Sequence, residues 1–153
     1  MNRETVRKTY CDLAESYKLV LQGLKKKSLL ISFLRLLVFI GGLIITVFTF
    51  SYSAAGGVMV MLITLFSFLL LVKLFTSYSA KITVTENLIK INDNEIKGLD
   101  GDLSGFDGGH GWIDAKHDFS NDIDLFGESS MFRYLNRTVT GTGKRMLAEW
   151  LYD

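Results

Sequence analysis

The chain has 153 residues and a formal net charge of +1, with 48% hydrophobic and 22% charged residues. These averages resemble those of a soluble protein, but 37 consecutive residues between Arg35 and Lys73 carry no charge, which excludes both a single soluble globule and a disordered tail. The one cysteine, Cys11, excludes an internal disulfide scaffold. Proline is absent, so no residue of that kind forces a helix to stop.

Residues 1–27 are predicted to form a cytoplasmic amphipathic helix. Apolar residues recur there every three or four positions, which is the period of an amphipathic helix or of a short coiled-coil seam: Val6, Tyr10, Leu13, Tyr17, Val20 and Leu24. Residues 1–35 hold eight basic and three acidic groups. Such a helix could lie on an anionic leaflet, pair with another helix or a second copy, or pack against the cytoplasmic part of its own chain.

Residues 28–77 are predicted to form a transmembrane hairpin. The uncharged run is too long for one span of about 20 residues and is sufficient for two. Its small, turn-prone segment Ser51–Gly57 divides it into spans at about 28–50 and 58–75. Neither span has a polar face that a soluble bundle could present to water. A cleaved signal peptide is a poorer interpretation, because the run starts late and contains a second span.

The basic residues beside the spans predict their orientation. Lys25, Lys26, Lys27 and Arg35 flank the entry of the hairpin, and Lys73 and Lys81 flank its exit. Basic residues favour the cytoplasmic side, so both termini are expected in the cytoplasm and the protein in the cytoplasmic (inner) membrane. The spans contain few polar residues, which favours an anchor over a transporter subunit: Ser32, Thr46, Thr49, Thr64 and Ser67.

Residues 78–128 are predicted to form a cytoplasmic helix followed by a connector rich in glycine and aspartate. Ile82 to Leu99 is the helix, and its expected inward residues are Leu88, Ile91, Ile96 and Leu99. The loop from Gly98 to Gly111 carries three aspartates that would repel phosphate. From Lys73 onward acidic residues outnumber basic ones by four, a poor match for nucleic acid.

No catalytic or metal site is predicted in the chain. The connector and the residues after it hold histidines and aspartates whose spacing matches neither a zinc nor a calcium site: His110, Asp114, His117, Asp118, Asp122 and Asp124. Cys11 has no histidine nearby in the sequence. Gly141–Lys144 is not a phosphate-binding loop, because Arg145 follows where Ser or Thr is required.

The last residues are predicted to form two short capped helices joined as an αα-hairpin. Thr140 is expected to cap a helix from Gly141 to Tyr152, whose core-facing stripe would be Met146, Leu147, Trp150 and Leu151. A shorter helix capped by Ser129 or Ser130 would present Met131, Phe132 and Leu135.

This C-terminal stretch resembles the MutS family of DNA mismatch repair ATPases. The resemblance lies in Asp-Ile-Asp-Leu-Phe-Gly at 122–127, in Ser-Met-Phe at 130–132 and in Leu-Asn-Arg-Thr-Val-Thr at 135–140, followed by Gly143, Leu147 and Trp150-Leu151. Residues 129–153 are similar to the start of the helical core domain of that family. The positions that transfer as structural motif residues are Asp122, Asp124, Phe126, Gly127, Asn136, Arg137, Thr138, Thr140, Gly143 and Trp150.

The hairpin and the aspartate-rich approach, with Ser32–Leu37 and Asn94–Asp102, look like a membrane-anchored subgroup of that family. The resemblance implies that the complete protein binds ATP, Mg²⁺ and DNA, and that this chain is its truncated N-terminal part, tethered to the bilayer and to the rest of its own polypeptide. Phe126-Gly127-Glu128 has the Phe-x-Glu spacing of mismatch-reading members but lies at the entry to the core domain. No ATP, DNA, cofactor or metal ligand transfers to the chain.

The sequence therefore predicts a mainly α protein with an amphipathic helix, a transmembrane hairpin, a cytoplasmic connector and the start of a MutS-like core domain. The leading function is to anchor a MutS-like ATPase to the membrane. The alternative is a small, self-contained membrane adaptor that binds a partner protein through its N-terminal amphipathic helix.

Overall fold

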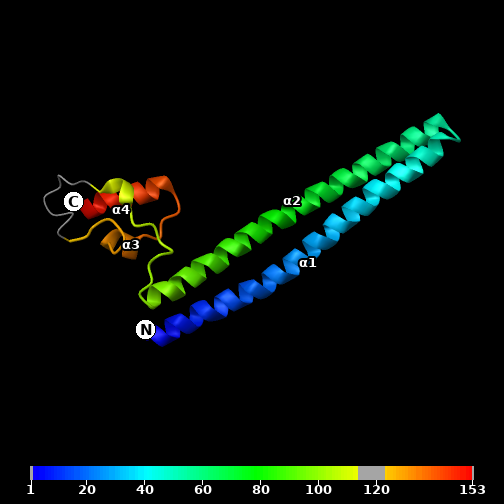
Figure 1. Ribbon diagram of the computed structural model, residues 1–153. Coiled ribbons are helices and arrows are strands. Elements are labelled where there is room, and N and C mark those ends of the chain that lie inside the picture. Colours follow the sequence, from blue (N-terminus) through cyan, green and yellow to red (C-terminus); the bar gives the residue numbers. More distant parts are fainter. Residues whose placement is uncertain (1, 114–122, 153) are drawn as a thin grey trace. The chain divides into compact units, whose positions relative to one another are not determined.

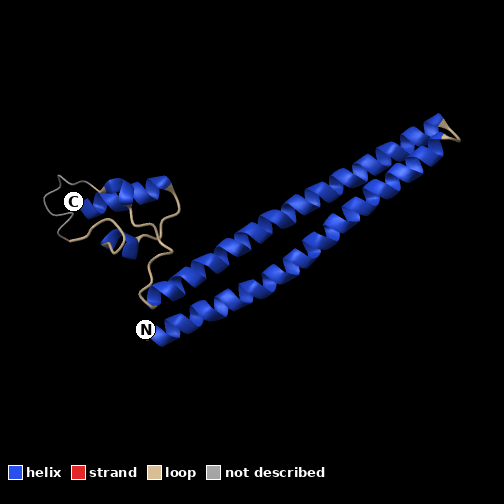
Figure 2. Ribbon diagram, in the orientation of Figure 1, coloured by secondary structure: helices blue, strands red, loops and turns tan. Residues whose placement is uncertain are grey.

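The computed structural model describes residues 2–113 and 123–152, and its elements are helices and loops (Figure 1, Figure 2). The helices are α1 (Arg3–Phe50), α2 (Ala54–Leu99), the short 3₁₀ helix η1 (His110–Trp112), α3 (Met131–Leu135) and α4 (Gly141–Tyr152). No strand occurs in the ranges described, so the mainly α prediction is confirmed. The chain divides into two compact units, one of Leu13–Ile89 and one of Met1–Asp12 with Lys90–Asp153.

The predicted helical pieces join into two long helices. The N-terminal amphipathic helix and the first span are one helix, α1, and the second span and the helix to Leu99 are one helix, α2. The predicted helix start at Ile82 is therefore wrong, while the domain bounds and the membrane-span limits within α1 and α2 stay predictions. The physical reason is that the chain has no proline to stop a helix near Ile82, and a helix propagates once it is nucleated.

The turn of the hairpin is shorter than predicted. It comprises only residues 51–53, while Ala54–Gly57 forms the first turn of α2. The Ser53 side chain accepts a hydrogen bond from the Gly56 N–H at 3.4 Å, and its carbonyl accepts one from the Gly57 N–H at 3.0 Å. Ser53 thus caps α2, because its oxygens satisfy N–H groups that a helix start leaves unpaired.

In the unit Leu13–Ile89, α1 and α2 lie antiparallel with a continuous seam between them (Figure 1). The buried and half-buried positions recur every three or four residues along both helices, as in a coiled coil. On α1 they include Ala14, Tyr17, Leu21, Leu24, Ser28, Arg35, Val38, Gly42, Thr46 and Thr49, and on α2 Gly57, Thr64, Leu71, Phe75, Tyr78, Ile82 and Thr85. Many of these residues are small or hydroxylated, so the helix backbones can approach closely.

Gly42 is the closest approach in the middle of this seam. A Cβ at this position would overlap the Thr64 side chain, whereas a Cβ on the neighbouring Gly41 would meet nothing within 4 Å. On the side of this contact away from the turn, the Phe39 and Phe68 rings are 5.9 Å apart and Lys25 Nζ lies 2.8 Å from Glu86 Oε1. These pairs fix one register for the two helices across the unit.

The apolar side chains of this unit point outwards. Both helices are long and apolar enough to cross a membrane, and none of their most apolar windows is buried within the protein. Leu36, Ile44 and Phe66 are each more than half exposed. In water this surface would be unfavourable by about 25 cal/mol for each Å² of apolar area, whereas hydrocarbon is a matching solvent for it.

The unit of residues 2–12, 90–113 and 123–152 has a small aromatic core. Leu125, Phe126, Phe132 and Ala148 are its buried residues. The Phe132 ring centroid lies 5.4 Å from that of Trp112 and 5.4 Å from that of Phe126. The core therefore brings the connector, α3 and α4 together.

Several expected inward residues are exposed. Leu13 and Val20 on α1, and Ile91 on α2, are exposed, while Ala14, Thr85 and Asn92 are buried instead. The predicted helical period is correct, but its phase differs at these positions: Ala14, Leu21 and Asn92, each one residue further along, are the less exposed ones.

Substituting Gly42 by Leu should weaken the seam. The added side chain cannot fit against Thr64, and overpacking typically lowers the free energy of unfolding by about 1–3 kcal/mol. The measurement is the unfolding of the full chain by SDS in mixed micelles, followed by the loss of helix–helix contact. Gly41→Leu, which adds the same side chain where space is open, should change little. Equal destabilisation by the two variants would contradict this seam.

Candidate functional site

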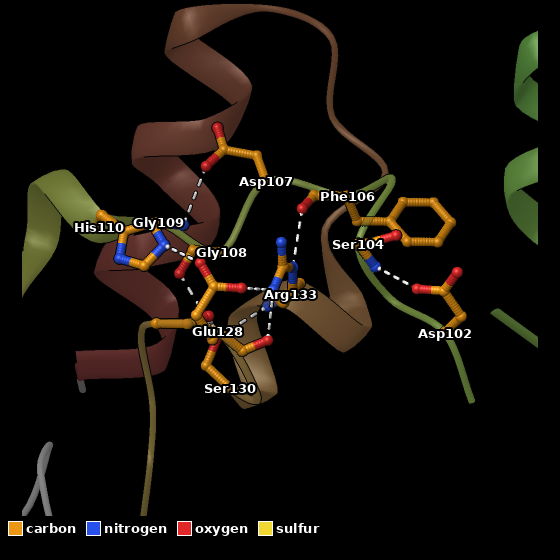
Figure 3. A network of polar contacts seen from close by, with 11 residues as sticks. Asp102, Ser104, Phe106, Asp107, Gly108, Gly109, His110, Glu128, Ser130 and Arg133 are labelled. Atoms are coloured by element: carbon orange, nitrogen blue, oxygen red, sulfur yellow. Dashed lines mark hydrogen bonds and ion pairs between the residues drawn. The ribbon is translucent and has the colours of Figure 1, made fainter. Parts of the chain in front are cut away.

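Arg133 on α3 is the centre of a polar network in the C-terminal residues (Figure 3). Its Nε donates to the Phe106 carbonyl at 2.9 Å, and its Nη1 donates to the Glu128 carbonyl at 2.6 Å and forms an ion pair with the Glu128 carboxylate. Ser130 caps α3, as predicted, by accepting the Arg133 N–H at 3.2 Å. His110 Nε2 lies 3.2 Å from the other Glu128 oxygen. The network ties the connector to the start of α3.

Two glycines allow the connector to reach the aromatic core. The Gly127 N–H donates to the Gly108 carbonyl at 2.8 Å. Gly109 has a φ of 70°, and a Cβ there would collide with the rings of Phe126 and Phe132. Glycine is required at this position because it tolerates positive φ and leaves room for the rings.

Asn136, Arg137 and Thr138 of the family motif lie together at the end of α3. The buried Asn136 side chain donates to the Asp107 carbonyl at 3.3 Å and accepts from the Thr138 N–H at 3.0 Å and from its hydroxyl at 2.6 Å. The Arg137 guanidinium lies 3.8 Å from the Phe106 ring centroid, and its Nη2 lies 3.2 Å from Glu95 Oε2. These side chains bind partners within the chain and thereby hold the backbone in place.

Thr140 and Gly143 form the start of α4 as predicted. The Thr140 side chain accepts the Gly143 N–H at 3.1 Å, and its carbonyl accepts the Lys144 N–H at 3.0 Å. A Cβ on Gly143 would lie 3.1 Å from the Thr140 hydroxyl and 3.4 Å from the Thr138 Cβ. The helix runs from Gly141 to Tyr152, the bounds expected from the sequence.

The remaining motif residues have different environments. Phe126 lies in the core, its ring centroid 5.0 Å from that of Tyr152, and Asp124 accepts the Met131 N–H through its carbonyl. Trp150 does not face the core: it is 69% exposed, and Met146 is also exposed. The expected stripe is therefore rotated, with Ala148 as the buried residue and Leu147, Leu151 and Tyr152 packed on the core. Asp122 lies outside the described residues.

The side chains of the Phe-x-Glu pattern at 126–128 are not exposed in a way that would let them read a DNA mispair. Phe126 is buried, and Glu128 is engaged by Arg133 and His110. An aromatic wedge needs a ring that can leave the protein surface and stack on a base. This stretch therefore supports the core.

A hollow of about 340 Å³ lies beside the motif. Its charged lining is paired, because Glu95 binds Arg137 and Lys144 Nζ lies 2.7 Å from Asp107 Oδ2. Paired charges leave little net field for a phosphate. Among the described residues no group of three or more His, Cys, Asp or Glu could hold a metal ion, while Asp114, His117, Asp118 and Asp122 lie outside those residues.

Three carboxyl groups in this unit have lowered pKa values. The hydrogen bond from Lys144 is the largest cause for the lowered pKa of Asp107, followed by that from the Gly109 N–H. The hydrogen bond and ion pair with Arg133 lower the pKa of Glu128. Hydrogen bonds from the Ser104 side chain and backbone lower the pKa of Asp102. All three groups are thus held as anions by local donors.

These partners could not be found in the sequence. Glu95, Phe106, Asp107 and Arg133 come from three separated segments, and none carries a local motif that names its partner. Only the capping pattern around Ser130 and Thr140 was readable, because a cap depends on residues within one turn.

The hairpin is the second candidate site, because its charged residues lie on the side of the apolar surface that is away from the turn. Between Glu15 and Glu86 the chain holds seven basic residues and no acidic one. Arg35 belongs to the spanning helix α1, and its Cζ lies 5.2 Å from the Phe75 ring centroid. The hydroxyls of Thr46 and Thr49 donate to carbonyls of their own helix at 2.7 and 2.8 Å. They are therefore not arranged as an ion path.

No family model, no curated protein and no solved structure matches the chain. The resemblance to the MutS family thus depends on the quoted residues alone and stays a prediction.

Acid should destabilise the C-terminal residues through Asp107 and Glu128. Because their folded pKa values are below the ordinary values of about 3.9 and 4.3, their contribution is complete above those ordinary values and is lost as the pH falls through the folded ones. Lys144→Gln should raise the Asp107 pKa towards its ordinary value, as measured by carboxyl NMR titration of the full chain in micelles. Arg145→Gln, one residue away, should leave it unchanged. An Asp107 pKa that ignores Lys144→Gln would contradict this contact.

Proposed function

We propose that the chain is the membrane-anchoring N-terminal part of a MutS-like DNA mismatch repair family ATPase. The observation that carries the proposal is the arrangement of the motif from Asn136 to Gly143. Each residue of this motif that resembles the family has an internal structural partner, such as Asp107 for Asn136 and Glu95 for Arg137. Side chains bound to one another in this way are what we expect at the start of a helical core domain.

The hairpin of α1 and α2 supports the anchoring role. Both helices are long and apolar enough to cross a membrane, and the hairpin turn at residues 51–53 is uncharged. With Lys25, Lys26, Lys27, Lys73 and Lys81 at the opposite end, the positive-inside tendency favours cytoplasmic termini and an inner-membrane location.

In this proposal the chain positions other domains rather than performing chemistry. ATP, Mg²⁺ and DNA are bound by the ATPase and clamp parts that the family resemblance implies for the complete protein. The paired charges around the hollow near Arg137 fit this division, because they leave no unpaired cation there for a phosphate among the described residues. The anchor would confine DNA engagement to the membrane surface.

A membrane adaptor is the second candidate function. It is favoured by exposed apolar residues on α1 outside the spans, namely Leu13, Leu19 and Val20. Val20 and Leu24 also line a groove of about 410 Å³ with Val84 of α2. A partner helix or a second copy could cover this surface.

The experiment is to isolate the native protein from its own membranes with an antibody to this chain and to measure ATP hydrolysis in detergent. The proposal predicts ATP hydrolysis that double-stranded DNA stimulates several-fold, recovered in the membrane fraction. In the double variant Leu19→Glu with Val20→Glu, the ATPase activity should still be isolated with this chain, because the anchor and the ATPase belong to one polypeptide.

The adaptor function predicts a different outcome. An ATPase or other partner would then be a separate polypeptide, and the double glutamate variant would release it, since charges on the groove oppose apolar docking. Membranes from cells that lack the protein serve as the control. An isolate that hydrolyses no ATP, with or without DNA, would overturn the ATPase proposal.

A further inference from the structure

Arg35 is a cation without an acidic partner at the edge of the apolar surface. No Asp or Glu occurs from residue 16 to residue 85, and among the described residues no carboxylate lies within 4.0 Å of its guanidinium. Its Cζ lies 5.2 Å from the Phe75 ring centroid. A guanidinium has five N–H donors in a planar fork, and a ring face satisfies none of them by a full hydrogen bond.

A groove runs along α1 from this residue. It has a volume of about 480 Å³, and its lining includes Ser32, Phe33, Arg35, Leu36, Phe39 and Phe68. Ser32 and Arg35 are three positions apart, so they lie on the same helix face. Phe33, Leu36 and Phe39 are each more than half exposed. The groove therefore has two polar donors, Ser32 and Arg35, in the half nearer Leu29, and an apolar floor from Leu36 to Phe39 with Phe68.

The depth of Arg35 places this polar end near the cytoplasmic membrane surface. From Arg35 to Phe50 the helix rises about 22 Å, which is less than the hydrocarbon thickness of about 30 Å. Arg35 thus starts inside the hydrocarbon boundary, and its long side chain can extend towards the headgroups.

A second level of cations lies further out on the same hairpin. Lys25, Lys26 and Lys27 are about 13 Å from Arg35 along the helix axis. The antiparallel register, given by Lys25 with Glu86 and by Phe39 with Phe68, places Lys73 near the level of Arg35. Anionic headgroups are attracted to such a band, while the ammonium of a zwitterionic headgroup is repelled by it.

We propose that the groove beside Arg35 binds an anionic phospholipid, with its phosphate at Arg35 and Ser32 and one acyl chain along Phe33, Leu36 and Phe39. The inference rests on the membrane insertion proposed above and adds a lipid class to it. Charge complementarity selects the occupant: the fork matches a phosphate bidentately, and the apolar floor matches a hydrocarbon chain. A soluble phosphate would make no apolar contact with that floor.

The test is native mass spectrometry of the full chain in detergent, titrated with palmitoyl-oleoyl phosphatidylglycerol or with phosphatidylcholine of the same chains. The expected result is a preference for phosphatidylglycerol of about tenfold, since a hydrogen-bonded charge pair contributes on that order. Arg35→Gln should abolish the preference. Lys18→Gln, which removes a basic residue of the same helix outside the groove, should retain it.

Equal binding of the two lipids, or a preference that survives Arg35→Gln, would overturn the inference. Inorganic phosphate at millimolar concentration should not displace the bound lipid, and displacement would identify an ion site instead. Flotation with vesicles separates this test from the proposed function. A wild-type chain that does not float refutes the anchor, whereas one that floats but does not discriminate lipids refutes only the lipid site.

Arg35→Lys is the control for a loss of membrane insertion in Arg35→Gln. It keeps the charge for flotation and loses the planar fork, so it should float normally and show a preference reduced several-fold. A full preference in Arg35→Lys would show that charge alone attracts the lipid and would contradict the proposed phosphate contact.

Discussion

The close seam between α1 and α2 in the unit Leu13–Ile89 is the constraint on which the hairpin depends. Hydrocarbon does not drive apolar helices together, so their association needs close packing and small residues. Gly42 against Thr64 and Gly57 against Phe50 supply that closeness. With these small residues at the closest contacts, many large apolar side chains lie on the outer surface, where a bilayer can solvate them.

The same seam continues beyond the length that a bilayer needs. From Leu13 to Phe50 the helix rises about 56 Å, against a hydrocarbon thickness of about 30 Å. Under the proposed membrane insertion, the part of the helix pair nearer Leu13 extends into water, and Lys25 pairs with Glu86 there. The spacing of three or four residues between seam positions accordingly continues past the predicted edge of the membrane.

The C-terminal residues depend on a different interaction, the buried aromatic contacts of Phe132. This ring has no exposed surface and touches the connector through Trp112 and Phe126. The arginines then fix the loops around it: Arg133 binds Phe106 and Glu128, while Arg137 binds Glu95. These contacts hold the loops in place around the Phe132 ring.

Local signals in the sequence predicted the parts of the fold that depend on neighbours in the chain. The caps at Ser130 and Thr140, the bounds of α4 and the two apolar stretches were all readable. The length of the helices was not, because nothing at residues 27 or 75 says whether a helix ends. Trp150 was predicted to face the core but is exposed, and the burial of Asn136 was not predicted. Both environments depend on contacts with the distant connector.

The most direct test of the membrane account is the accessibility of single cysteines to a membrane-impermeant maleimide in intact cells. Cys11 is exposed on α1 and is the one cysteine of the chain, so it reports the N-terminal side, and Ser53→Cys in a Cys11→Ser background reports the exposed turn. The account predicts that Ser53→Cys is labelled in intact cells and that Cys11 is labelled only after permeabilisation. Labelling of Cys11 in intact cells, or protection of Ser53→Cys there, would contradict it.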